Sequence, residues 1–292
     1  MTKMSFISLA ALAAILAAAF APGALAATNV GISATVRNTV DIKTSTDKEL
    51  RPVVVREPVH LGDAVVSSSQ SSMQILLLDH SVFTIGADAH ITIDRFVYDP
   101  DRGTSDIALS VTKGAFRFMS GRLVGNAGQG AIRTPIGTIG VRGTIVQGAV
   151  GPDVRNILAG EPGIPPFTGD PSTDVLVLLD GPGRYAQGLD KPGRIDVAGD
   201  TSPSTFFCHP GAAMLLVAGR KPYGPFDLSD AAYARLQALL SKTPNSNDQD
   251  IDVGSAAVGS GDILNIGDPG GADLPDQQNL ELPFLAGKPI KK

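Results

Sequence analysis

The stretch that decides the fold runs Arg133-Thr134-Pro135-Ile136-Gly137-Thr138-Ile139-Gly140-Val141-Arg142-Gly143-Thr144. Glycine recurs at every third position of this stretch, at 137, 140 and 143. Because glycine weakens a strand, a glycine inside one usually marks a bulge, a tight corner or a close approach of two backbones. A phosphate-binding loop is excluded, since neither a helical pattern nor the lysine that such a loop requires follows these glycines. The stretch therefore predicts β-structure in which glycines turn the corners.

Short apolar runs before this stretch have the length and the alternation of β-strands. They lie at 53–55, 64–66, 75–78, 91–93, 107–111 and 116–118. Turn residues separate the runs at intervals of about 8–12 residues, a spacing that predicts an all-β sandwich, barrel or solenoid. We expect a short β-solenoid or roll, with a β-sandwich as the alternative. The whole β domain is expected at 27–225, with its core at 55–150.

The second half of the chain changes pattern. Residues 151–173 are rich in Pro and Gly and are interpreted as a loop insertion, either a surface flap or a hinge to a second layer. Further strands are expected at 174–218. One helix is expected at 226–242, where Ser229 or Asp227 can cap the first turn and apolar residues recur at helical spacing.

The predicted helix and the segment after it differ in what they can bury. We expect the helix to pack on the sheet or to cover an open edge. Residues 243–292 are rich in Asn, Asp, Gly, Pro and Gln and lack an apolar stripe, which predicts a disordered tail. The apolar cluster in this tail, 280–285, is either an intramolecular contact or a segment that adds to the sheet edge of a partner.

Residues 1–26 have the three parts of a secretory signal peptide. Lys3 supplies a positive start, residues 6–20 are uncharged and mostly apolar, and Ala24-Leu25-Ala26 fits a cleavage site. The apolar part is shorter than the roughly 20 residues that a membrane span needs, and an uncleaved anchor is the alternative. We expect export to the periplasm, with an extracellular location as the alternative, and no stable membrane span once the signal is removed.

Composition narrows the classes of function. The chain has 292 residues, and 24 Lys+Arg against 29 Asp+Glu give a net charge of −5. This mild acidity, without a basic cluster, argues against nucleic-acid binding. The single cysteine, Cys208, excludes an internal disulfide framework and a cysteine zinc site. Because it lies in an apolar, strand-like run, we expect it to be buried as a small hydrophobic residue.

Five pieces of the sequence resemble, in the same order, the FecR domain, a periplasmic β-domain of bacterial iron-transport regulators. They are residues 59–65, 73–81, 82–86, 111–117 and 134–144. The structural signature that this resemblance implies consists of Gly62, Asp63, Asp79, Gly114, Thr134, Pro135, Gly137, Gly140, Arg142, Gly143 and Thr144. Regulators of this family also carry a cytoplasmic segment and a membrane helix. A signal peptide stands in their place here, so the resemblance implies the periplasmic domain alone.

Two residues in these pieces could have more than one role. The Arg142 guanidinium either hydrogen-bonds the carbonyls of neighbouring turns, which we favour, or recognises an anionic ligand or partner. His80 stands where the family has glycine after Asp79. Because histidine tolerates a positive φ better than most residues, this position favours a left-handed turn over a metal site.

Catalytic and metal-binding patterns are missing from the sequence. The four histidines form no zinc-type pair, and no serine lies in a nucleophile elbow. Asp94, Asp99, Asp101 and Asp106 are interpreted as turn and surface acids rather than as a glycosidase pair. We therefore predict no catalytic residue, no cofactor and no metal.

The function that these observations and the resemblance predict is binding without catalysis. We expect an exported FecR-like domain that binds an envelope protein or a cell-surface ligand in the periplasm of a Gram-negative bacterium and acts in envelope signalling. The alternatives are an enzyme that acts on envelope polysaccharide and a structural envelope protein.

Overall fold

The computed structural model of the chain describes residues 27–44, 46–121, 129–181, 193–200 and 202–240. They fall within one compact unit, Met1–Gly254. The second unit, Ser255–Lys292, lies outside the described residues. So do the predicted signal peptide at 1–26 and the predicted tail at 243–292 with its apolar cluster at 280–285.

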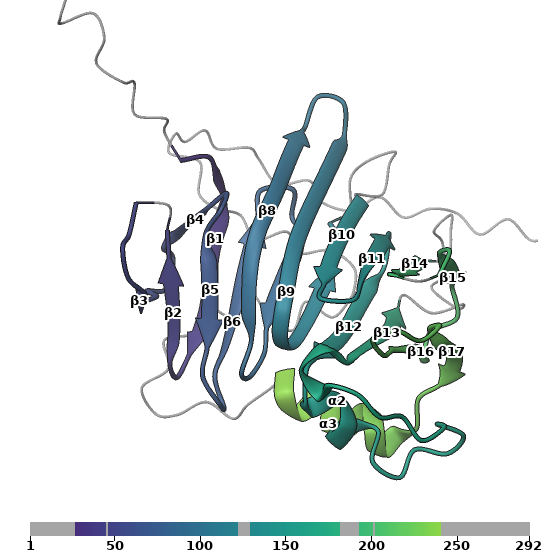
Figure 1. The fold of residues 1–292 in the computed structure, drawn as a ribbon. Helices are drawn as coiled ribbons and strands as arrows, with labels where there is room; N and C mark the ends of the chain where they lie inside the picture. Colours follow the sequence, from purple (N-terminus) through teal and green to yellow (C-terminus); the bar gives the residue numbers. More distant parts are fainter. Residues whose placement is uncertain (1–26, 45, 122–128, 182–192, 201, 241–292) are drawn as a thin grey trace, which may run out of the picture. The chain divides into compact units, whose positions relative to one another are not determined.

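Within the described residues, seventeen strands hydrogen-bond into one sheet that does not close and that folds over into two layers, sheet A and sheet B (Figure 1). Neighbours in sheet A are β4 (Pro58–His60), β1 (Asn29–Arg37), β6 (Ser72–Leu77), β7 (Val82–Ile85), the second part of β9 (Thr104–Met119), β12 (Ile145–Val150), β13 (Val175–Gly181), β16 (Ala212–Leu216) and β17 (Tyr223–Asp227). Neighbours in sheet B are β3 (Arg51–Pro52), β2 (Val40–Lys43), β5 (Ala64–Ser67), β8 (His90–Asp99), the first part of β9, β10 (Gln129–Thr134), β11 (Gly137–Arg142), β14 (Arg194–Gly199) and β15 (Thr205–Phe207). The predicted all-β class is confirmed.

The long strand β9 joins the two layers. Its first part pairs with β8 and β10 in sheet B, and its second part pairs with β7 and β12 in sheet A. The change occurs at Gly114, whose φ is +87°. A Cβ at this position would lie 2.2 Å from the Cα of Ala89, so a residue with a side chain would have to move the neighbouring backbone. Glycine is therefore required where the chain crosses between layers.

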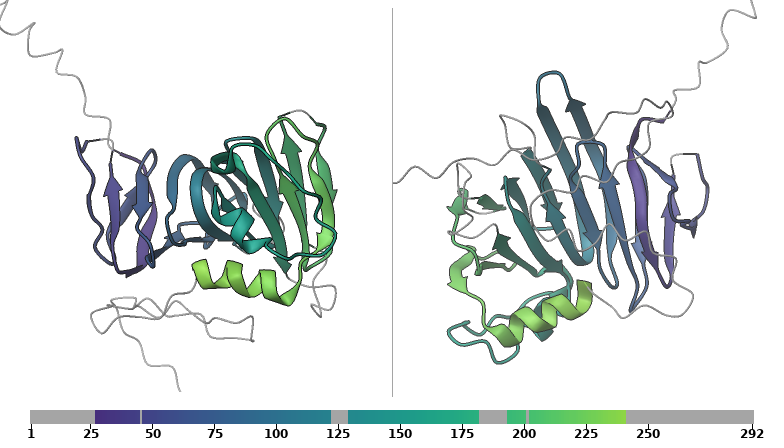
Figure 2. Two further views of the ribbon diagram at one scale, coloured as in Figure 1. Left: turned by 60° about the horizontal axis from the view of Figure 1, so that its bottom comes forward. Right: turned by 180° about the vertical axis from the view of Figure 1, so that it is seen from behind.

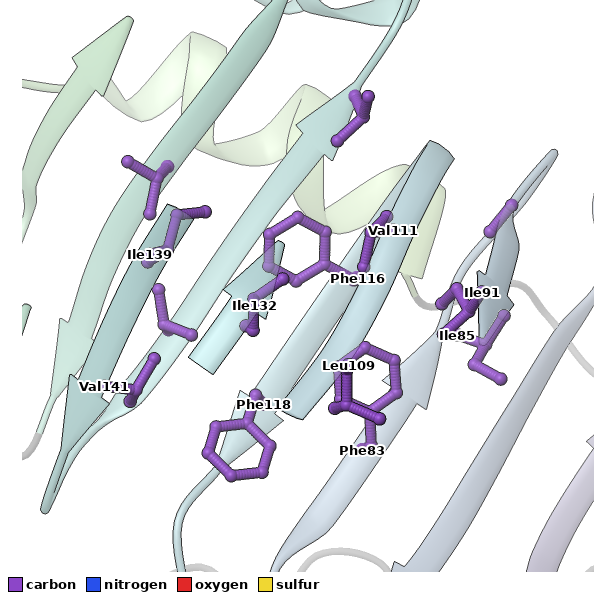
Figure 3. Close-up of a cluster of buried hydrophobic side chains, with 14 of the residues drawn as sticks. Phe83, Ile85, Ile91, Leu109, Val111, Phe116, Phe118, Ile132, Ile139 and Val141 are labelled. Carbon is purple, nitrogen blue, oxygen red and sulfur yellow. The ribbon is translucent and has the colours of Figure 1, made fainter. Parts of the chain in front are cut away.

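One continuous apolar core lies between the layers. Alternate residues of both sheets point into it, as a period of two along each strand dictates. Phe83, Phe116 and Phe118 lie near its centre (Figure 3). The rings of Phe83 and Phe116 stack with their centroids 6.4 Å apart. Because each such side chain gains about 1.5–3 kcal/mol on burial, this core holds the layers together.

A second apolar cluster covers part of the outer face of sheet A. It joins outward residues of β9, β12, β13 and β16 to two helices, α2 (Asp153–Ile157) and α3 (Asp230–Leu240) (Figure 2). Helix α3 contributes Ala232, Leu236 and Leu240, which recur every fourth residue and are all buried. The helix therefore packs on the sheet, which was one of the two roles expected for it.

Helix α3 begins at Asp230, later than the start of the helix predicted at 226–242. Residues Tyr223–Asp227 form the edge strand β17, which occupies the first positions of the predicted helix. Ser229 caps the helix, since its Oγ accepts a hydrogen bond from the amide of Ala232 at 3.3 Å. Glu161 accepts hydrogen bonds from the amide of Ser229 at 2.8 Å and from its hydroxyl.

The insertion at 151–173 is more than a loop. It contains α2 and a short 3₁₀ turn, Pro171–Thr173. Val154, Ile157 and Leu158 are buried in the second cluster. Through them the insertion belongs to the layer of helices on sheet A.

No helix within residues 27–240, so far as they are described, is long and apolar enough to cross a membrane.

Candidate interaction surfaces

Gly62 and Asp63 form the turn between β4 and β5. The φ of Gly62 is +87°, and the Asp63 side chain is fully buried. Its Oδ2 accepts a hydrogen bond from the amide of His60 at 2.8 Å, whereas its buried Oδ1 has no partner. Burial raises the pKa of Asp63 above the ordinary value for aspartate, although the hydrogen bond from His60 lowers it. The carboxylate thus shapes a turn and is not open to a ligand.

Asp79 ties the turn between β6 and β7 to the opposite layer. Its carboxylate accepts hydrogen bonds from the amide and hydroxyl of Ser81, at 3.0 and 2.8 Å, and from the hydroxyl of Ser105 on β9 at 2.6 Å. The φ of His80 is +64°, which confirms the predicted left-handed turn. Both residues therefore serve the fold.

Three residues of the decisive stretch shape the turn between β10 and β11. The hydroxyl of Thr134 donates to the carbonyl of Gly137 at 2.9 Å, and Pro135 lies exposed between them. A Cβ on Gly137 would lie 2.5 Å from the carbonyl oxygen of Ala198 on β14. These positions therefore set the turn and allow close strand pairing.

Gly143 and Thr144 take the chain from sheet B back to sheet A. The φ of Gly143 is +61°, and the buried hydroxyl of Thr144 donates to the carbonyl of Gly181 at the end of β13. Gly143 thus lies at a corner, as the glycine pattern predicts, whereas Gly140 lies in the interior of β11.

Gly140 and Arg142 are the two signature residues for which packing supplies no explanation. A Cβ on Gly140 would lie 3.5 Å from the Cβ of Asp196, which is ordinary contact. Arg142 is exposed at the end of β11. Within the described part of the chain its guanidinium makes no hydrogen bond or ion pair, so the favoured contact with turn carbonyls is not found. Both residues lie on the outer face of sheet B.

We call this surface the open face: Asp94, Arg95, Asp106, Ala131, Arg133, Gly140, Arg142, Arg194 and Asp196, which surround the fully buried Ala108. Across neighbouring strands the register aligns Ala108, Ala131 and Gly140 in a row of small residues. In the part of the chain that is described, no helix belongs to this face (Figure 1).

Ion pairs flank the row of small residues. Arg95 lies 2.7 Å from Asp106, Arg133 lies 3.1 Å from Asp94, and the Nε of Arg194 lies 3.0 Å from Asp196. All three arginines are about half exposed, so each pair contributes at most about 1 kcal/mol to stability. The pairs are therefore better suited to fixing the direction of the side chains than to holding the fold together.

The acids singled out in the sequence are engaged as surface and turn residues. Asp94 and Asp106 belong to the ion pairs of the open face. Asp99 accepts a hydrogen bond from the amide of Arg102 at 3.0 Å at the tip of the β8–β9 hairpin, beside Asp101. In the described ranges, no group of three or more His, Cys, Asp or Glu side chains could hold a metal ion.

A small pocket lies beside the β10–β11 turn. Its lining residues are Ile136, Gly199, Asp200, Leu216, Val217, Ala218, Gly219, Arg220 and Pro222. Asp200 is the single carboxylate among them. Two facing carboxylates, as a glycosidase requires, are therefore not present in this pocket.

Cys208 is exposed, so the prediction that it is buried is wrong. Strand β15 ends at Phe207, and only this residue of the apolar run points into the core. The preceding Phe206 is 59% exposed, and the Arg194 guanidinium lies 4.2 Å from the centre of its ring. Alternation along β15 predicts that Phe206 points outward. Composition does not show that the strand ends at Phe207, and for this reason the exposure of Cys208 could not be predicted.

The arginines that pair on the open face were missed by the sequence reasoning. A signal was present for Arg194, because it alternates with apolar residues in the run Arg194-Ile195-Asp196-Val197, which forms a strand. The partner of Arg95 lies on the neighbouring strand, that of Arg133 lies two strands away across β9, and that of Arg194 lies two residues along the same strand. Choosing between these arrangements required the register of the sheet.

The central part of the chain is similar to a known protein family. The family described as FecR protein matches residues 63–158. Two crystal structures, at 1.65 and 2.50 Å resolution, of a protein from Parabacteroides distasonis ATCC 8503 described as a candidate anti-sigma factor also match, with TM-scores of 0.36 and 0.35 and 12% identity. Each match covers 56% of this chain and 60% of that protein, so the chain spans about three fifths of the length of these structures. No curated protein matches. The residues that match the FecR family, 63–158, run from the turn after β4 to the end of α2.

Proposed function

We propose that this protein is a non-enzymatic binding module of envelope signalling, and that its FecR domain binds a partner protein or ligand through the open face. The partner is an envelope protein or a cell-surface ligand. The chain acts in the periplasm, to which the signal-peptide pattern of residues 1–26 directs it.

One observation carries this proposal. Gly140 and Arg142 are signature residues that lie on the open face, on which no described helix packs, while the turn and crossing residues of the signature all have structural roles. A residue type that serves neither packing nor a turn is available for recognition. Arg142 therefore becomes the residue through which we expect recognition to occur.

The chemistry of Arg142 indicates the kind of group that it binds. A guanidinium presents its donors in a planar fork that fits a carboxylate with two parallel hydrogen bonds. The acids nearest to it in the sheet register, Asp106 and Asp196, already pair with other arginines. An acidic group of the partner would supply the missing counter-charge.

The absence of catalysis is part of the proposal. A polysaccharide-active enzyme would need two carboxylates free to face a sugar, one on each side. Supporting the non-enzymatic function, Asp94 and Asp106 are both bound to arginines on a sheet face rather than in a cleft.

Charge reversal at Arg142 tests the proposal. The full-length tagged chain is expressed in its native host, envelope proteins are crosslinked mildly, and recovered partners are quantified by mass spectrometry. We expect Arg142→Glu to lower the recovery of the main partner by about tenfold or more, which corresponds to one charge-assisted contact.

The matched control is Arg102→Glu. Arg102 is 82% exposed at the hairpin tip, so its reversal changes the net charge equally without touching the open face. Equal recovery by the wild type and the Arg142→Glu variant would contradict the proposal. Recovery of no partner under any condition would count against it as well.

A further inference from the structure

A row of five apolar side chains crosses the outer face of sheet A. The register places Ile32 opposite Leu76, Leu76 opposite Val82, Val82 opposite Met119 and Met119 opposite Ile145. All five are partly exposed, and none belongs to either buried cluster. We call these five residues the apolar row. Five neighbouring strands carry it, so it is about 19 Å long.

The same face of sheet A already carries a helix. Helix α3 packs on outward residues that include Ala115 of β9 and Ala149 of β12 (Figure 2). It runs across the strands: it starts after β17, and near its end the carbonyl of Leu239 accepts a hydrogen bond from the amide of Ala87, just after β7. The fold thus shows that this face accepts a helix laid across its strands.

The apolar row lies beside α3 and runs in the same direction. Met119 and Ile145 are each four residues along their strands from Ala115 and Ala149. Four residues of β-strand span about 13 Å. Neighbouring helices pack with their axes about 8–10 Å apart, so the space beside α3 is wide enough for a second helix.

Arg117 lies between α3 and the apolar row. It points to the same side as Met119 on β9, and one of its terminal nitrogens donates to the side chain of Gln237 of α3 at 2.8 Å. Its Nε is buried and has no hydrogen-bond partner. Among the described residues no carboxylate lies within ion-pair distance of Arg117. Asp180 is reached only indirectly, through Gln237 and Gln147. Among the described residues, the buried Nε of Arg117 is therefore left for an acceptor from elsewhere.

We propose that an amphipathic α-helix of a partner protein docks on the apolar row beside α3, with an acidic side chain placed against Arg117. The spacing favours a helix, because one helical turn advances 5.4 Å and neighbouring strands lie about 4.8 Å apart. One apolar residue per turn then meets one residue of the row. About 13 helical residues cover its length. This inference goes beyond the proposed function, since it concerns the opposite outer face and does not depend on Arg142.

A photocrosslinking amino acid at position 82 tests this docking in the full-length chain within its native host. The crosslinked segment is identified by mass spectrometry. We expect a segment of another protein in which apolar residues recur at three- and four-residue spacing, with an acidic residue at the edge of that stripe. The control position is Val66, which is partly exposed on the outer face of sheet B, and the product should not form there.

Two variants separate docking from a general loss of structure. Met119→Asp places a charge in the apolar row at a partly exposed position, and we expect it to lower the yield of the product about tenfold while the melting temperature stays close to that of the wild type. A synthetic peptide of the crosslinked segment should bind Arg117→Gln about tenfold more weakly than it binds the wild type. A peptide in which the acidic residue is replaced by lysine should bind the Arg117→Glu variant, because the two charges are then exchanged.

Several results would overturn the inference. They are a product that joins two copies of this chain, a product with a segment that lacks the amphipathic pattern, no product at position 82, and unchanged binding by Arg117→Gln. Arg142→Glu distinguishes this inference from the proposed function. If it leaves the recovery of partners intact while the position-82 product still forms, the open-face function fails and the docking on sheet A stands.

Discussion

The outer faces of the two sheets are built differently, although both sheets share one core. Part of sheet A is covered by α2 and α3, and a second apolar cluster fills the space beneath them. The open face of sheet B carries small residues and arginine–aspartate pairs instead. Covering contributes to stability because it removes apolar surface from water, whereas the paired charges contribute little. The comparison indicates that the covering of sheet A contributes more to stability than the ion pairs on the outer face of sheet B do.

We expect the largest loss of stability from a substitution on the outer face of sheet A, where the helices cover it. Leu236 of α3 is fully buried against sheet A, so Leu236→Ala removes apolar contacts and leaves a cavity. We expect it to lower the free energy of unfolding by about 2–5 kcal/mol. Thr138→Ala, at an exposed position of β11 on the open face, should change it by less than about 0.5 kcal/mol. Urea denaturation of both variants measures the difference, and similar losses in the two would show that the faces do not differ in this way.

Part of this asymmetry could be predicted from single strands. Strand β13 reads Val175-Leu176-Val177-Leu178-Leu179, a continuous apolar run that is typical of a strand buried on both faces. Strand β11 alternates between apolar and other residues, which is typical of a strand with one face in solvent. The turn at His80 and the cap at Ser229 were also predictable, because both depend on local backbone chemistry.

The contacts that define the candidate surfaces could not be predicted in this way. Arg133 and Asp94 pair across 39 positions of sequence, and Ser229 meets Glu161 across 68. The apolar row consists of one residue from each of five strands, so no run in the sequence reveals it. Such juxtapositions follow from the register of the sheet, and local patterns do not fix that register.

Substitutions of two glycines test the same comparison, and we expect them to change the free energy of unfolding by an intermediate amount. Gly114 has a φ of +87° at the crossing between layers, and a Cβ there would lie 2.2 Å from a backbone atom of Ala89. We expect Gly114→Ala to lower the free energy of unfolding by about 2 kcal/mol or more, from backbone strain and overpacking. Gly140→Ala on the open face meets only ordinary contacts, so it should raise that free energy by about 0.4–1 kcal/mol by restricting the unfolded chain.

Urea denaturation of the two glycine variants gives this comparison directly. The substitution is the same, and only the surroundings differ. A loss of stability in Gly140→Ala as large as that in Gly114→Ala would mean that Gly140 has a structural role. It would then remove one of the two residues on which the proposed recognition by the open face depends.

The smallest expected effect is a difference between the two faces in how the free energy of unfolding depends on pH. Tyr233 of α3 donates a hydrogen bond to Asp180 of β13 at 3.0 Å, and its pKa is raised by burial and by the negative charge of Asp180. The folded state therefore holds the phenol proton more tightly than the unfolded chain does. The resulting stabilisation is complete below the unfolded pKa of about 10 and is lost as pH rises through the folded pKa.

Tyr233→Phe removes this proton. At pH 7 it should cost about 1 kcal/mol through the lost hydrogen bond, and the difference from the wild type should shrink as pH rises above about 10. Unfolding free energies at pH 7, 9, 10 and 11 measure this. On the open face, Arg133→Ala provides the contrast, because it removes an exposed ion pair that involves no phenol, and we expect its small cost to be the same at each pH. If the costs of the two substitutions followed pH in parallel, the loss of stability in alkali would reflect the charge of the whole molecule rather than the contact between α3 and sheet A.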